Sequence, residues 1–446
     1  MTPTATEIAA AVRSGRMTAR RAVEDALERI EASDPRIHAF QEVRVFASLR
    51  EADEVDARPD RADLPLAGVP VAIKDNVPVQ GEPMRIGSGA TDPAPQTVDH
   101  EIVRRLRQAG AVVVGTTRTP ELCVFGATDS KYGVTRNPWN LERTPGGSSG
   151  GAAAAVAAGA VPIAHGNDGM GSIRIPAACC GLVGLKPGRG VVPADLGNGS
   201  WFDMAENGPI TTTVADAALM FAVLADRPGS ATITEPGRLR IALSTKVPAA
   251  GTPLDRHWAA AARESADLLA GAGHFVTTAN PHYGQTLILS EAVRWTAGTE
   301  LDARLVADRS KLEMRVRRHA ALGRMALALH LPREKGRTAW QDRAARFFDD
   351  HDVLITPALA QTPIMAKAWS TRGWSANVWA NARYAPFAAP WNLAGWPALA
   401  VPAGVDPGGM PLAVQLVARP GGEDMLLAVA AQLEVLRPWA RLAPAS

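Results

Sequence analysis

TPGGSSGGAAAAVAAGAVPIAHGNDGMGSIRIP, residues 144–176, holds two glycine-rich serine loops separated by a helix and a strand. The small residues of 150–158 predict a tightly packed helix, which Gly159 ends. The apolar run over 161–165 predicts a short strand. A helix followed by a buried strand in this way is typical of an α/β layered protein.

The same alternation continues outward from this stretch. Strands are predicted from short apolar runs at 69–73, 111–114, 161–165, 239–243, 275–278, 353–356, 398–401 and 412–418. Helical patterns lie between many of them, so we predict an α/β fold in which helices cover a buried sheet.

No internal repeat or low-complexity linker divides the chain, so we expect a single domain over residues 1–446. Residues 1–60 predict an N-terminal helical layer. Residues 60–225 form the expected core, which contains both serine loops. Residues 228–350 predict a variable helical lobe over a pocket.

Composition excludes several classes of protein. The net charge of +2 gives no reason to expect nucleic acid or an acidic membrane as a partner. The three cysteines match neither a disulfide framework nor a zinc site, and we expect no metal and no cofactor. The N-terminus lacks an apolar leader and no run approaches 18 apolar residues, so we expect a cytoplasmic protein that does not enter a membrane.

Three segments carry residues suited to chemistry. Lys74 directly follows an apolar strand, where a lysine is partly desolvated. Ser148 precedes a helix N-terminus, which favours negative charge. Ser172 follows a run of small residues whose N–H groups can converge on an oxyanion. A phosphate-binding loop is the rival interpretation, but the chain has no Walker-type motif.

A Ser-His-Asp hydrolase is poorly supported. Ser148 has glycines at −2 and +2, but no apolar strand directly precedes it, as the strand–turn–helix of a nucleophile elbow requires, and Ser172 has Met170 at −2. Of the nine histidines only His165 lies near a serine loop, and we interpret it as a core residue at a strand end. A lysine base acting through a second serine fits the three segments better.

These segments resemble the amidase signature family closely. The resemblance rests on GGSSGG at 146–151, GNDGMGSIRIP at 166–176, VAIKDN at 71–76 and the segments at 136–140 and 384–417. It covers nearly the whole chain except roughly residues 228–350. It implies a large mixed, mostly parallel β-sheet wrapped by helices on both faces, and an amidase that hydrolyses linear carboxamides.

The resemblance also implies a role for each site residue. Ser172 would attack the amide carbonyl. Ser148, which would follow a cis peptide bond, would pass the proton of Ser172 to Lys74. Lys74 would be the base in its neutral form. Backbone N–H groups of Gly169, Met170, Gly171 and Ser172 would hold the oxyanion. Ser149, Asp168 and Arg174 would support these groups.

A neutral Lys74 needs a strongly lowered pKa, because a free lysine has a pKa of about 10.4. Burial can supply this shift. A carboxylate beside the ammonium would oppose it. Asp75 is the next residue of an extended segment, so we expect its side chain to point to the other face and not to contact Lys74.

Met170 stands where the family usually has glycine. One interpretation is an active enzyme with a reshaped acyl pocket, and the other is a weakened site in a protein that binds without hydrolysis. If this position needed a positive φ, methionine would cost about 1–2 kcal/mol.

The substrate side is less defined. Met170, Trp391, Phe125 and Cys123 are candidate substrate-binding residues. The tryptophans at 369, 374, 379, 391 and 396 favour an aryl or otherwise apolar amide. The alternative function is the glutaminase subunit of an amidotransferase. A homodimer is a further possibility.

Overall fold

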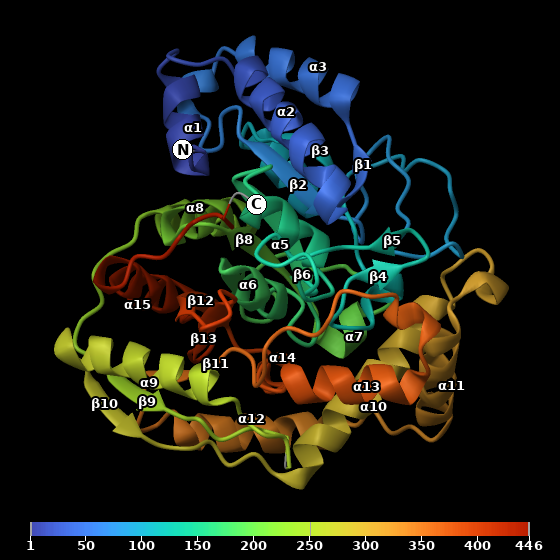
Figure 1. The fold of residues 1–446 in the computed structure, drawn as a ribbon, viewed down its shortest axis with the longest axis vertical. Helices are drawn as coiled ribbons and strands as arrows, with labels where there is room; N and C mark the ends of the chain where they lie inside the picture. The colour runs from blue at the N-terminus through green and yellow to red at the C-terminus, as the bar shows by residue number, and fades with distance from the viewer. Residues whose placement is uncertain (1, 250, 445–446) are drawn as a thin grey trace.

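The computed structural model describes residues 2–249 and 251–444, and within them eleven strands form one sheet (Figure 1). The strand order is β1-β3-β2-β6-β8-β7-β12-β13-β11-β9-β10. The strands are β1 (Phe40–Val43), β2 (Pro70–Lys74), β3 (Val112–Thr117), β6 (Ile163–Asp168), β7 (Val183–Lys186), β8 (Glu206–Thr211), β9 (Arg240–Leu243), β10 (Phe275–Thr278), β11 (Val353–Pro357), β12 (Ala398–Val405) and β13 (Pro411–Val417). β4 (Asp129–Ser130) and β5 (Gly133–Val134) form a separate short pair.

The sheet is mixed, as the sequence predicts, and all eight predicted strands are confirmed. The expectation of mostly parallel pairing is wrong. β2 pairs in parallel with β3 and β6, and β9 pairs in parallel with β10 and β11. The other neighbours are antiparallel. The error arises because β1, β7 and β8 were missed, and all three make antiparallel pairs.

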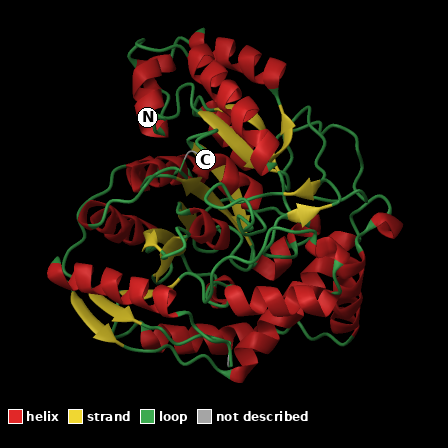
Figure 2. Cartoon of the chain, in the orientation of Figure 1, coloured by secondary structure: helices red, strands yellow, loops and turns green. Residues whose placement is uncertain are grey.

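Helices surround the sheet (Figure 2). The helices are α1 (Ala5–Arg13), α2 (Ala19–Ile37), α3 (Val45–Asp56), α4 (Glu101–Gln108), α5 (Gly150–Ala157), α6 (Arg174–Cys180), α7 (Ser200–Asp203), α8 (Val214–Ala225), α9 (Arg256–Gly271), α10 (Gln285–Ala303), α11 (Met314–Ala328), α12 (Glu334–Phe347), α13 (Trp374–Tyr384), α14 (Ala389–Ala394) and α15 (Glu423–Leu436). α5 and α6 contact each other and the middle of the sheet, while α15 contacts α8 and α9 as well as β12. No helix in the described ranges is both long enough and apolar enough to span a membrane.

Small residues bring the central helix close to the sheet. Every residue of α5 is buried, and α5 packs on β2, β6 and β8. Glycine and alanine have little side chain, so the helix axis can approach the strands closely. As a result, the start of α5 and the ends of β2 and β6 lie together, and these are the places where the sequence puts its serines and lysine.

The four helices α10 to α13 form a helical body beside this core. In Figure 1, α10, α11 and α13 lie at the lower right, and α12 lies at the bottom near the centre. α10 packs against α7, α11, α12 and α14, so it reaches from this body back to the segment that follows the serine loops.

Candidate active site

Lys74 ends β2 with its side chain fully buried. Its Nζ lies 2.7 Å from Ser148 Oγ and 3.3 Å from the carbonyl oxygen of Asn167. Burial lowers the pKa of Lys74, and Cys123 and Asp168 oppose this shift without cancelling it. The lysine is therefore biased toward the neutral amine that can accept a proton.

Asp75 points away from Lys74, which confirms the expectation from the extended backbone. Its Oδ1 accepts a hydrogen bond from the Arg85 N–H at 2.9 Å. Burial raises the pKa of Asp75 to about 8. Among the described residues, no carboxylate oxygen lies within 4.0 Å of the Lys74 ammonium. The lysine thus has no ion pair that would hold its proton.

The Gly147–Ser148 peptide bond is cis, as the resemblance implied. The loop leaves no room for larger residues: a Cβ on Gly147 would lie 2.8 Å from the carbonyl oxygen of Phe125. The neighbouring Ser149 joins the two serine loops. Its N–H donates to the carbonyl of Ser172 at 3.2 Å, and its Oγ contacts the backbone of Asn167.

The carboxylate of Asp168 fixes the loop that carries Ser172 through hydrogen bonds to its backbone. Its Oδ1 accepts from the Gly171 N–H at 2.5 Å, and its Oδ2 accepts from the Ile173 N–H at 3.2 Å. Gly171 has a φ of 116°, and a Cβ there would lie 2.6 Å from the Cβ of Ala388. Glycine is therefore required at Gly171, both for its backbone conformation and for space.

This contact corrects one of the predicted oxyanion donors. The N–H of Gly171 is already bound to Asp168, so it does not face the cavity as a free donor. The N–H groups of Gly169, Met170 and Ser172 make no hydrogen bond with any part of the chain that the structure describes. These three remain available to an oxyanion.

Arg174 and Asp168 form a buried, two-pronged ion pair. Arg174 Nε lies 2.9 Å from Oδ2 and its Nη2 lies 3.0 Å from Oδ1. Burial alone would raise the pKa of Asp168, but the guanidinium of Arg174 and the amide of Asn392 hold it well below its ordinary value. The carboxylate stays charged, so the loop stays in place.

Two further residues of this network were not predicted. Arg174 Nη1 donates to Gln415 Oε1 at 2.6 Å, and Arg174 Nη2 donates to Asn392 Oδ1 at 2.5 Å. Asn392 Nδ2 also donates to the Asp168 carbonyl at 2.8 Å. Each is a single amide inside an apolar run, which was the available sequence signal.

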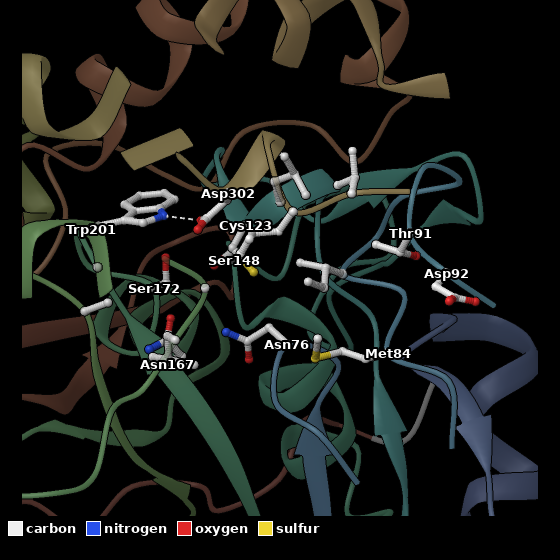
Figure 3. Close-up of a pocket in the computed structure, with 18 of the residues that line it drawn as sticks. Asn76, Met84, Thr91, Asp92, Cys123, Ser148, Asn167, Ser172, Trp201 and Asp302 are labelled. Carbon is white, nitrogen blue, oxygen red and sulfur yellow. Dashed lines mark hydrogen bonds between the residues drawn. The ribbon is translucent and has the colours of Figure 1, made fainter. Parts of the chain in front are cut away.

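Two cavities meet at Ser172. We call the first the polar arm, because polar side chains such as Ser148, Asn167 and Asp302 line it. Figure 3 shows these residues facing it together with Ser172, Cys123 and Trp201. The second is the apolar arm, which Ser172, Cys123 and Trp201 also line. Their volumes are about 210 and 240 Å³. Ser172 therefore stands where a substrate could extend in two directions.

The predicted substrate contacts divide between these arms. Cys123 lines both, while Phe125 and Met170 line the apolar arm. Trp391 lines neither, so that prediction is wrong. It is fully buried and packs against Trp340 at a ring distance of 5.5 Å. Trp391 belongs to α14, and its large apolar ring packs into the hydrophobic core.

Met170 fits its position without backbone strain. It does not adopt a positive φ, unlike Gly171 beside it. The expected cost of methionine is therefore not incurred, and its side chain narrows the apolar arm. His165 is fully buried, with Nε2 2.8 Å from Asn207 Oδ1, and burial lowers its pKa to about 3. It lines neither arm, as expected of a core residue.

Trp201 stands between the two arms in an unusual backbone. The residues of α7, Ser200 to Asp203, all have φ between 46° and 59°. Each costs about 1–2 kcal/mol relative to right-handed backbone. Trp201 Nε1 donates to Asp302 Oδ2 of α10 at 2.6 Å, and Arg337 of α12 donates to the carbonyl of Phe202. These two helices thus fix the divider between the arms.

α10 also supplies residues that the sequence did not predict for the site. Ile288, Glu291, Ala292 and Trp295 line the apolar arm and follow the spacing of one helix face. No cluster of three or more histidine, cysteine, aspartate or glutamate side chains suited to a metal occurs within residues 2–249 and 251–444.

Comparisons with known proteins agree with this geometry. The family model for Amidase matches residues 21–427. AmiB2 of Mycobacterium tuberculosis, a protein named as an amidase, is 42% identical over 96% of this chain and 95% of its own. The 6-aminohexanoate-cyclic-dimer hydrolase of Paenarthrobacter ureafaciens is 35% identical over 99% of this chain and 96% of its own.

Solved structures show the same likeness. A 6-aminohexanoate cyclic dimer hydrolase structure superposes with a TM-score of 0.86 at 30% identity, covering 98% of this chain and 97% of the other. A bacterial aryl acylamidase superposes with a TM-score of 0.85 at 25% identity, with the same coverage. The chain therefore belongs to the amidase signature family and is an amidohydrolase.

Proposed function

We propose that amide hydrolysis proceeds through an acyl-enzyme on Ser172. Neutral Lys74 takes the proton of Ser148, Ser148 takes that of Ser172, and Ser172 Oγ bonds to the carbonyl carbon. The N–H groups of Gly169, Met170 and Ser172 stabilise the oxyanion. The proton then returns through Ser148 to the amide nitrogen as the C–N bond breaks. Water, deprotonated by the same route, hydrolyses the ester and releases the acid.

One observation carries this proposal. The Lys74 nitrogen is fully buried, lies 2.7 Å from Ser148 Oγ, and has a serine hydroxyl, a backbone carbonyl and the Cys123 thiol as its polar neighbours, with no carboxylate in contact among the described residues. A charged ammonium is costly in such a place. The ordinary backbone at Met170, with its N–H still available, favours an active enzyme over a binding protein.

The two arms suggest how a substrate lies. Ser148 lines the polar arm and delivers the proton to the leaving nitrogen, so we propose that the amine occupies this arm. The acyl group then occupies the apolar arm, against Phe125 and Met170. This favours an aryl or other apolar acyl group. A relative is named for hydrolysis of a cyclic dimer, so we do not restrict the substrate to linear amides.

The glutaminase-subunit alternative is not favoured, because the relatives above are named as an amidase, a hydrolase and an acylamidase. The homodimer and the cytoplasmic location stay predictions. Light scattering of the purified chain would measure the oligomeric state.

A fluorophosphonate probe tests the mechanism. We expect the wild type to gain one label by intact-mass analysis, and Ser172→Ala to gain none while remaining folded. Acyl p-nitroanilides give the matching turnover assay. Labelling of Ser172→Ala at the wild-type rate, or turnover by that variant, would contradict the assignment of the nucleophile.

A further inference from the structure

Glu291 is a buried carboxylate without a partner. It lies on α10 among the residues that line the apolar arm, and it is only 8% exposed. Its Oε1 has no hydrogen bond, and no ion pair to Glu291 occurs among the described residues. A buried acceptor that is left unpaired destabilises the folded protein, so its position needs an explanation.

The neighbouring groups do not supply one. Arg294, one turn along the same helix, donates from Nη2 to the Arg333 carbonyl and to Glu334, and its Nε has no partner among the described residues. No charged group among the described residues lowers the pKa of Glu291. Asn381, which also lines the arm, uses its Oδ1 for the Gly126 N–H and its Nδ2 for the Asn377 carbonyl. The hydroxyl of Tyr283 lies close enough to Glu291 for its pKa to be raised by the carboxylate, and it has no hydrogen-bond partner in the described part of the chain.

Glu291 is an acidic residue among apolar neighbours. On its face of α10 the other residues at the arm are Ile288, Ala292 and Trp295. It is the one acidic residue that lines this arm within the described ranges. Burial raises the pKa of Glu291 to about 8. The group is thus protonated when the arm is empty at neutral pH, and a cation placed beside it would favour the carboxylate.

Ser172 lines the same arm. A substrate whose carbonyl lies at Ser172 and whose acyl chain fills the apolar arm therefore extends toward Glu291. An acyl chain that ends in an apolar group would leave the Glu291 carboxyl group without a partner. An ammonium or another N–H donor would satisfy it by a charge-assisted hydrogen bond.

We propose that Glu291 is a specificity-determining residue that binds an amino group at the far end of the acyl chain. The preferred substrates are then amides of amino acids in which an apolar spacer separates the amine from the carbonyl. This inference rests on the proposed function, because it takes Ser172 as the nucleophile and the apolar arm as the acyl site. It adds a substrate class that the arms alone do not define.

Matched substrate pairs test it. ω-Aminoacyl p-nitroanilides of increasing chain length are each compared with the alkanoyl p-nitroanilide in which a methyl group replaces the ammonium. We expect the wild type to prefer the amino member at one chain length. In Glu291→Leu, kcat/KM for that substrate should fall about 100-fold, because an ammonium would be buried without a partner. The alkanoyl partner should change less than about 3-fold or improve.

Glu291→Gln sharpens the test, since it retains the hydrogen-bonding shape and removes the charge. We expect a loss of about 10-fold, confined to the amino substrate. Leu289→Gln is the control, because Leu289 lies on the same helix and is 65% exposed. It should leave both substrates unchanged.

The outcomes separate the two proposals. Equal losses on both members of a pair, no loss on either, or a wild type that prefers the alkanoyl member at every length would overturn the role of Glu291. In each of those cases the fluorophosphonate still labels Ser172, and the mechanism stands. Absence of both labelling and turnover in the folded wild type would instead refute the mechanism.

Discussion

A buried carboxylate has partners in the loop that carries Ser172, and it lacks them in the wall of the apolar arm that α10 forms with Ile288, Glu291, Ala292 and Trp295. In the loop, Asp168 accepts hydrogen bonds from Gly171, Ile173 and Arg174. In the wall, Glu291 has no partner for its Oε1. Both carboxylates are buried, but the neighbours of Asp168 hold its pKa low, while burial alone raises that of Glu291.

The difference separates two tasks. Groups that must be in place before any substrate arrives are held by the protein itself, which avoids reorganisation during the reaction. A group that recognises a substrate is satisfied only when that substrate binds, so it is left incomplete in the free enzyme. Variants on each side of the comparison should therefore fail in different ways.

The largest effect is expected on the loop side, at the base. Lys74→Met removes the proton acceptor while keeping the buried apolar stem, so kcat should fall about 10²–10⁴-fold with little change in KM. Steady-state kinetics on an acyl p-nitroanilide measure both. Lys311→Met, at an exposed lysine, is the control. A Lys74→Met enzyme within about 3-fold of wild type would remove Lys74 as the base.

A loss of stability should come next. Asp168→Asn leaves the buried guanidinium of Arg174 without its counterion, and the free energy of unfolding should fall by about 3–5 kcal/mol in urea denaturation. Asp352→Asn, in the partly exposed pair with Arg240, should cost much less.

The stability loss in Asp168→Asn should also depend on pH. The folded-state pKa of Asp168 lies below its unfolded value, so the contribution is present above about pH 3.9 and is lost as pH falls toward the folded-state pKa. The gap between wild type and variant should therefore narrow in strong acid. A constant gap would show that the ion pair does not account for it.

Selectivity should change at the junction between loop and wall. Met170→Gly widens the apolar arm, so the ratio of kcat/KM for a bulky acyl group to that for acetyl should rise about 10-fold. A panel of acyl p-nitroanilides measures this ratio. Met314→Gly, at an exposed methionine on α11, controls for the substitution itself. An unchanged ratio would exclude Met170 from acyl selection.

The smallest effect should be a shift in pH dependence. Cys123 raises the pKa of Lys74, and protonated Lys74 cannot act as the base. Thus kcat/KM falls as pH drops through this pKa, and Cys123→Ala should move that acid limb to lower pH. Cys180→Ala, in the core, should leave it in place. A shift of the limb to higher pH in Cys123→Ala would reverse the assigned sign.

The sequence predicted the parts of this comparison unequally. Lys74, Ser148 and Ser172 lie in short motifs, and local glycine patterns mark both serine loops. The apolar strands were also predictable, because a buried strand is a continuous apolar run. β8, with the sequence ENGPIT, has no such run, so it was missed.

The wall was not predictable, because its residues meet only in the folded chain. Glu291 lies more than a hundred residues from Ser172 and occupies a helix whose pattern gives no functional signal. Trp391 shows the reverse error. Its large ring suggested a substrate contact, but such rings fill cores as readily as they line pockets. Position along the chain could not distinguish these two uses.

The left-handed turn at α7 has an evolutionary consequence. Trp201 divides the arms, yet its place is set by Asp302 of α10 and, through Phe202, by Arg337 of α12. The segments that carry Lys74, Ser148 and Ser172 end before α6, far earlier in the chain, and the residues beyond them that support the Ser172 loop, Asn392 and Gln415, lie outside residues 284–348. Exchange of residues 284–348 between relatives should therefore transplant substrate preference while the inherited chemistry is left intact, so new specificities can arise without reinventing the catalyst.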